Sequence, residues 1–103
     1  MKSMGNLQKM LKQAKEMQEK IKKELEVMRV EGTSGGGMVE IVMDGNKNII
    51  SIKIDPEVVN KEDVEMLQDL ISAAFNDAAG KVDENLKEKM GAMGAGLKIP
   101  GLS

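Results

Sequence analysis

Residues 32–55 read GTSGGGMVEIVMDGNKNIISIKID. In two runs of this stretch, 39–43 and 50–54, apolar side chains recur at every second position, and most of them are β-branched. A period of two is typical of strands that bury one face. Between the runs stands Asp44-Gly45, a pair typical of hairpin turns, in which we expect the glycine to adopt a positive φ. The stretch therefore predicts an antiparallel hairpin.

A third short strand is expected upstream of the hairpin, at about residues 28–33. Gly32 lies near the end of this segment and glycines 35–37 follow it before the hairpin, and such glycines mark turns or flexible links. The three segments would together form one small sheet, with helical sequence on both sides of it.

Residues 6–26 carry the apolar spacing of an α-helix. Intervals of three and four place the apolar residues on one face, and they are Leu7, Met10, Ala14, Met17, Ile21 and Met28. Asn6 is a suitable N-cap, so we expect a helix from about Asn6 to Glu26. Its stripe fits either a helix docked on the sheet or a coiled coil. Because so small a sheet cannot cover the whole helix, the N-terminal half is expected to project.

A second long helix is expected after the hairpin. Pro56 cannot continue a strand, so one short turn at residues 56–59 should precede a helix that opens at Asn60 or Lys61 and ends near Met90. Its apolar stripe is Val64, Leu67, Ile71, Ala74, Ala78, Val82 and Leu86. Acidic residues fall in the expected first turn, where they complement the helix dipole: Glu62, Asp63 and Glu65.

Small residues in the second helix, including Ala78 and Gly80, permit close approach of another backbone. The chain length predicts a single domain, which we place at residues 1–90. The segment 91–103 is rich in glycine and is expected to be a flexible tail.

The composition limits both the core and the chemistry. The chain has 103 residues, a single aromatic side chain (Phe75) and ten methionines, so a second copy is expected to complete its core. It has no cysteine and no histidine, which removes the commonest nucleophiles, bases and transition-metal ligands. Glycines 35–37 lack the residues of a phosphate-binding loop. We expect no enzyme, cofactor, metal site or small-molecule substrate.

The sequence also indicates where the protein resides. No apolar run approaches the ~18 residues needed to span a membrane. The first six residues lack the apolar core of a signal peptide. We therefore expect a cytoplasmic protein with no membrane partner.

Charge is distributed unevenly along the chain. The formal net charge is −2, but residues 1–31 carry eight basic and five acidic side chains, whereas residues 55–90 carry four and ten. Lysines of the first helix fall on related faces, where they are able to neutralise phosphates: Lys9, Lys12, Lys20 and Lys23. The asymmetry equally fits attraction between the two helical arms. With no aromatic available to stack on bases and no cluster that reads base edges, any DNA binding should be weakly sequence-specific.

Several motifs match a known protein family in order along the chain. They are NLQKMLKQA at 6–14, MQEK at 17–20, VEGTSGGGMV at 30–39, IDP at 54–56 and DLISAAFNDA at 69–78. Taken together they cover nearly the whole chain, which resembles the YbaB/EbfC family of nucleoid-associated proteins.

The resemblance implies an α+β fold of order α-β-β-β-α, with a small antiparallel sheet flanked by two long helices. It implies a homodimer whose long helices project like tweezers from joined sheets, with double-stranded DNA held between them. It also implies association with the nucleoid and an influence on DNA conformation and gene expression. The matching DNA-binding positions are Lys9, Lys12, Lys15, Lys20, Lys23, Lys81, Lys87 and Lys89. In or behind the shared sheet of the dimer we expect Val39, Ile41, Met43, Ile50 and Ile52.

Two other interpretations stay open. A protein-interaction module or adaptor would use the apolar helix stripes and the C-terminal tail to bind another protein, and the acidic second arm suits that better than DNA. A purely structural oligomer would bind neither.

Overall fold

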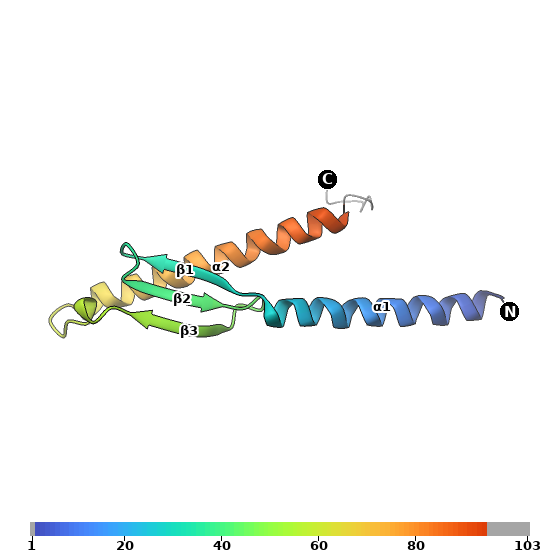
Figure 1. The fold of residues 1–103 in the computed structure, drawn as a ribbon, viewed down its shortest axis with the longest axis horizontal. Helices are drawn as coiled ribbons and strands as arrows, with labels where there is room; N and C mark the ends of the chain where they lie inside the picture. The colour runs from blue at the N-terminus through green and yellow to red at the C-terminus, as the bar shows by residue number, and fades with distance from the viewer. Residues whose placement is uncertain (1, 95–103) are drawn as a thin grey trace.

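The computed structural model describes residues 2–94, with side chains described for residues 5–91. The elements follow in the order α1 (Lys2–Val27), β1 (Val30–Ser34), β2 (Val39–Met43), β3 (Ile49–Ile54), the short 3-10 helix η1 (Pro56–Val58) and α2 (Val64–Gly94) (Figure 1). This is the expected α-β-β-β-α arrangement of the α+β class.

The three strands form one antiparallel sheet in the order β1-β2-β3. Gly32 lies opposite Ile41, which in turn lies opposite Ile52, so these three residues share one face. The β1–β2 turn uses left-handed backbone at three consecutive glycines, with φ of 59°, 70° and 94° at residues 35–37. Residues other than glycine rarely adopt this backbone conformation, which explains why three glycines occur in succession.

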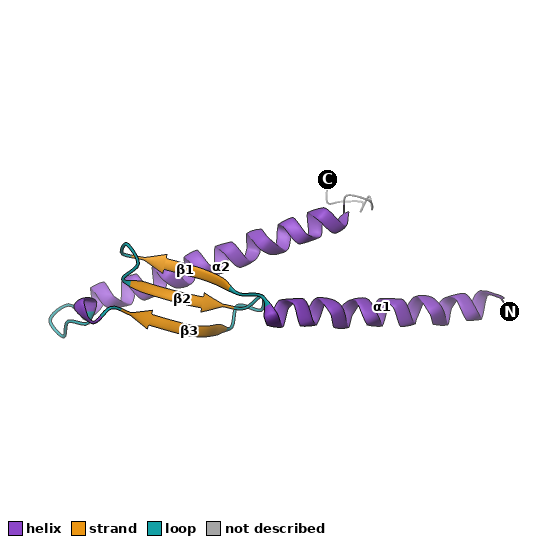
Figure 2. Ribbon diagram, viewed as in Figure 1, coloured by secondary structure: helices purple, strands orange, loops and turns teal. Residues whose placement is uncertain are grey.

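The core lies between the sheet and α2, which packs along one face of β1 and β2 (Figure 2). Its fully buried side chains include Ile41 from the sheet and Ala78 and Val82 from the helix. A Cβ on Gly32 would lie 2.6 Å from the Cβ of Ala78, so helix and strand approach as closely as they do only because both residues are small. Of the small residues noted in the second helix, Ala78 thus serves a contact within one chain, whereas a Cβ at Gly80 would meet nothing within 4 Å.

Helix α1 does not dock on the sheet. It extends from one end of the sheet, and α2 diverges from it on the same side (Figure 1). The molecule is accordingly elongated, with extents of 74 × 26 × 16 Å. Of the two arrangements left open for the apolar stripe, the docked helix is wrong, because only the base of α1 reaches the core, through Leu25 and Met28.

Both helix starts differ from the expected positions. Asn6 is not an N-cap, since α1 already begins at Lys2. Helix α2 begins at Val64 rather than at Asn60 or Lys61, because the side chain of Asp63 accepts a hydrogen bond from the Met66 N–H at 3.1 Å and caps the helix there. Of the acidic residues expected in the first turn, only Glu65 lies in it.

The C-terminal end of α2 lies at Gly94, four residues beyond the expected end of the domain at Met90. The remainder of the expected tail, residues 95–103, lies outside the described residues.

The β2–β3 connection is longer than a two-residue turn, and Gly45 does not have the positive φ expected of it. That conformation belongs to Lys47, with φ of 65°. The loop is built instead on Asp44, whose carboxylate accepts the N–H groups of Asn46 and Asn48, each at 2.9 Å. Gly45 is required for a different reason, because a Cβ there would lie 2.8 Å from the Leu25 side chain at the base of α1.

Candidate functional site

The outward face of α1 carries a row of lysines. At 3.6 residues per turn, Lys9, Lys12, Lys20 and Lys23 fall within about 80° of one another around the helix, and all four are exposed. Their common direction lies roughly opposite the apolar stripe. We call these four residues the lysine row. Between residues 9 and 23 the helix thus separates a cationic face from an apolar one.

The lysine row is electrostatically available. Among residues 5–91, ion pairs occur between Lys47 and Asp83 and between Lys81 and Asp77, so no member of the lysine row takes part in one. Over its full length α1 carries seven lysines and four glutamates, which leaves a net charge of +3. An exposed row of unpaired ammonium groups on a projecting rod is suited to a polyanion.

Two further lysines flank the row. Lys15 lies about 60° beyond Lys12 around the helix, and Lys22 is its neighbour seven residues on. Lys22 is not among the residues that the sequence predicts to bind DNA. Its spacing of seven residues from Lys15, which places both on one side of the helix, would have identified it. Both side chains are exposed.

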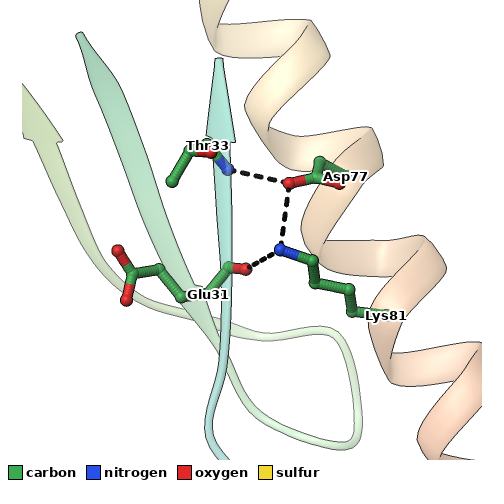
Figure 3. A network of polar contacts seen from close by, with 4 residues as sticks. All are labelled: Glu31, Thr33, Asp77 and Lys81. Atoms are coloured by element: carbon green, nitrogen blue, oxygen red, sulfur yellow. Dashed lines mark hydrogen bonds and ion pairs between the residues drawn. The ribbon is translucent and has the colours of Figure 1, made fainter. Parts of the chain in front are cut away.

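The structure gives Lys81 a role within the chain. Its ammonium group donates to the backbone carbonyl of Glu31 at 2.8 Å and lies 3.3 Å from the Asp77 carboxylate, which also accepts the Thr33 N–H at 3.0 Å (Figure 3). We call this arrangement the Asp77–Lys81 clamp. The Thr33 N–H, with a smaller contribution from Lys81, lowers the pKa of Asp77. The clamp satisfies backbone groups on the outer edge of β1, so Lys81 is committed to holding α2 against that strand.

The other two expected lysines of α2 are exposed but do not form a row. Lys87 and Lys89 lie about 160° apart around the helix. The described helix carries three lysines and six acidic residues, a net charge of −3. The structure therefore brings the expected lysines together on α1 and scatters them on α2.

The direction of α1 is fixed at its base by the β2–β3 loop. The Gly45 N–H donates to the Leu25 carbonyl at 2.8 Å, and the Arg29 guanidinium donates to the Glu26 and Met28 carbonyls, each at 2.8 Å. These contacts satisfy carbonyls that a helix C-terminus leaves without partners. Hydrogen bonds from Asn48 and Asn46, with help from the nearby Arg29, lower the pKa of Asp44, the residue on which the loop is built.

The residues expected at a dimer interface separate into two groups. Val39, Ile41 and Met43 are fully buried against α2 in a single protomer, so they have no surface left to offer a partner. Ile50 and Ile52 are exposed, because α2 covers β1 and β2 but leaves β3 largely uncovered. Only the second group is available for contact with a second copy.

Among the described side chains, residues 5–91, no three of the types that bind metals are grouped to hold an ion. No helix within the described residues 2–94 is both long and apolar enough to cross a membrane.

Comparison with known proteins agrees with the motifs noted in the sequence. A family model described as the YbaB/EbfC DNA-binding family matches residues 4–97. A nucleoid-associated protein of Geobacillus kaustophilus is 56% identical, over 96% of this chain and 94% of the relative. Another, of Caldanaerobacter subterraneus subsp. tengcongensis, is 51% identical over 94% and 90%.

A solved structure shares the fold. The crystal structure of an uncharacterized protein from Helicobacter pylori superimposes with a TM-score of 0.72 at 28% identity, covering 84% of this chain and 91% of that one. The fold of this chain is therefore also found in an experimentally determined structure.

Proposed function

The chain belongs to the YbaB/EbfC DNA-binding family, and we propose that it binds double-stranded DNA through the lysine row of α1. The observation that carries the proposal is the alignment of Lys9, Lys12, Lys20 and Lys23 on one exposed, unpaired face of a projecting helix. Ammonium groups in such a row contact phosphates, which are the same at every base pair. Binding is therefore of low sequence specificity.

Titration of DNA binding against salt tests this function. Each lysine that contacts a phosphate contributes about one unit to the slope of log affinity against log salt. Replacing the four lysines of the row by glutamine should weaken binding and flatten the slope. The matched control removes four positive charges elsewhere, at Lys53, Lys61, Lys87 and Lys89. An equal loss in both variants would overturn the assignment of DNA binding to the lysine row, because net charge or the lysines of α2 would then account for it. No binding by the natural chain at low salt would overturn the function.

The wider role we propose is that of a cytoplasmic, nucleoid-associated protein that changes DNA conformation and thereby influences gene expression. The names of the relatives at about half identity support the association with the nucleoid. Ligation of short DNA fragments into circles measures the change in conformation. Cyclisation rates unaltered by saturating protein would contradict it.

We also propose that the protein acts as a homodimer that uses β3. Ile52 remains 44% exposed although it faces the same side of the sheet as the buried Ile41. The outer edge of β1 is closed by the Asp77–Lys81 clamp, whereas β3 is an edge strand without such cover. A second copy is the simplest cover for this surface, since the described residues of the protomer supply none.

Ile52→Asp should convert the dimer into a monomer, measured by light scattering after gel filtration. Ser51→Asp places the same charge on the opposite face of β3 and serves as the control. A stable Ile52→Asp dimer would refute this placement.

A second candidate function is a protein-interaction adaptor, favoured by the apolar stripe that α1 leaves exposed. An adaptor would retain one stoichiometric partner protein after nuclease treatment. Loss of all retained protein on nuclease treatment would favour DNA.

A further inference from the structure

The lysine row is divided at its centre by an acidic residue. Of the residues between Lys12 and Lys20, Glu16 alone falls within the sector of α1 that the row occupies, and its side chain is exposed. The lysines lie four and seven residues to either side of it, at positions 9, 12, 20 and 23. The row therefore consists of two lysine pairs, 9 with 12 and 20 with 23, arranged symmetrically about one negative charge.

The spacing of the two pairs sets the distances on DNA that the row is able to match. A helix rises 1.5 Å per residue, so Lys12 and Lys20 lie about 12 Å apart along the axis, with Glu16 midway between them. The major groove of B-DNA is about 12 Å wide and the minor groove about 6 Å. A helix that crosses the major groove thus brings one lysine pair to each of the two phosphate rows that border it.

We propose that the lysine row lies across the major groove of double-stranded DNA, so that each lysine pair contacts the phosphates of a different strand. This inference rests on the proposed function and specifies how the same site engages its ligand. Phosphates are the same at every base pair, so this placement agrees with binding of low sequence specificity.

The central carboxylate distinguishes this placement from two others. Across the minor groove, both phosphate rows would approach within about 3 Å of the centre of the row, where the Glu16 carboxylate repels them. Along a single strand, phosphates recur about every 3.4 Å of the DNA axis, so one would again lie beneath Glu16. Across the major groove, Glu16 lies over the opening between the phosphate rows, toward which the amino groups of adenine and cytosine point. Only the last placement keeps the negative charge away from phosphate.

The symmetry of the row supports the same placement. The antiparallel strands of a duplex are related by two-fold axes that pass through the middle of each groove. A row whose lysines lie at equal distances on either side of its centre meets the two strands equivalently. Neither strand is then contacted by fewer lysines than the other.

Moving one lysine to the centre of the row tests the spacing without a change in net charge. The double variant Glu16→Lys/Lys20→Glu keeps the charge and the face of α1, but it shortens the inner gap from about 12 to about 6 Å. Its DNA affinity should fall at least about tenfold, and the slope of log affinity against log salt should flatten by about one unit. The matched control, Glu57→Lys/Lys61→Glu, makes the same exchange over the same interval at exposed positions outside α1, and it should bind like the natural chain.

Dimethyl sulfate identifies the occupied groove on the natural chain. This reagent methylates N7 of guanine, which lies in the major groove, and N3 of adenine, which lies in the minor groove. Saturating protein on a short duplex should slow the methylation of guanine several-fold and leave that of adenine close to the rate in free DNA. This measurement decides the question even if the double variant loses the helicity of α1, which circular dichroism measures.

The outcomes separate this inference from the proposed function. Unchanged or tighter binding by a helical double variant would overturn the spacing argument. Methylation of guanine at the rate in free DNA while the protein is bound, or protection of adenine in its place, would overturn the major-groove placement and leave DNA binding intact. Absence of binding by the natural chain at low salt would instead overturn the proposed function itself.

Discussion

The two helices of this protein have similar apolar patterns, but one is buried against the sheet and the other is exposed. Helix α2 buries Ala74, Ala78 and Val82 completely against the sheet, whereas the stripe of α1 stays exposed beyond its last turn. The contact surface accounts for the difference. Alanines on α2 meet Gly32 on β1 at close range, but the sheet offers no complementary surface to the larger Leu and Met side chains of α1. An amphipathic pattern shows which face of a helix needs cover, not which surface supplies it.

The helices also differ in how they are held. The Asp77–Lys81 clamp and the Ser34 hydroxyl, which donates to the Leu70 carbonyl at 2.6 Å, tie α2 to β1 at separate points along its length. Among the described residues, helix α1 is held only at its C-terminal end, by the Gly45–Leu25 hydrogen bond and the contacts of Arg29 and Met28. Helices with few tertiary contacts open at low free-energy cost, so α1 should exchange its amide hydrogens faster than α2 unless a partner covers it.

The largest contrast should come from truncating one isoleucine in each region. Ile41→Ala removes a fully buried side chain and should lower the free energy of unfolding by about 2–5 kcal/mol. Ile21→Ala, in α1, should cost the isolated protomer much less, because 41% of that side chain is already exposed. Denaturant titration of dilute protein measures both. Equal losses would mean that α1 packs on its own sheet after all.

A methyl group at the helix–strand contact should have the next largest effect. Gly32→Ala forces α2 away from β1 and should destabilise the protein by about 1–3 kcal/mol. Gly5→Ala is the matched change in α1, where a Cβ meets nothing within 4 Å, and it should stabilise that helix slightly. Thermal unfolding of the two variants distinguishes them. An unchanged melting temperature for Gly32→Ala would show that the contact is loose.

The clamp on α2 should appear as a smaller, pH-dependent effect. The pKa of Asp77 is lowered from 3.8 on folding, so its contribution to stability is fully present above the unfolded pKa and is lost as pH falls through the folded pKa. Asp77→Asn should therefore reduce the loss of stability below about pH 4. Asp69→Asn, on the same helix, controls for the charge alone. Parallel acid-unfolding curves for the natural chain and the Asp77→Asn variant would show that the clamp does not contribute to stability.

The smallest expected effect is on the outer side of α2. A Cβ at Gly80 meets nothing within 4 Å, so Gly80→Ala should raise the free energy of unfolding by roughly 0.5–1 kcal/mol through helix propensity. Denaturant titration measures this gain. A loss of stability would instead reveal that another chain packs against Gly80 in solution.

Much of the fold was predictable because local signals agreed. Alternation in residues 39–43 and 50–54 located two strands, and Pro56 located the short turn that follows them. The errors fell where side chains override local rules. The pattern predicts a turn glycine at Gly45, but the loop is held by Asp44, and the glycine instead makes room for Leu25.

The candidate site was predictable only in part. The spacing of Lys9, Lys12, Lys20 and Lys23 sufficed to place them on one face, because a helix has a fixed period. Nothing in the spacing of residues separates Lys81 from the lysine row, since its partners Glu31 and Asp77 become neighbours only when α2 packs on β1. Likewise, Ile41 and Ile52 follow the same pattern, and only the position of α2 makes one buried and the other exposed.

The sequence by itself determined the elements, their order and the opposite placement of lysines and apolar residues on α1. Such features follow from spacing along a regular backbone, which each segment carries within itself. Tertiary structure alone decided which helix lies on the sheet, which lysine is used in holding it there, and which isoleucines remain uncovered. These three outcomes depend on the close approach of surfaces that are remote in the chain. The spacing of residues within one segment does not show how well two such surfaces fit.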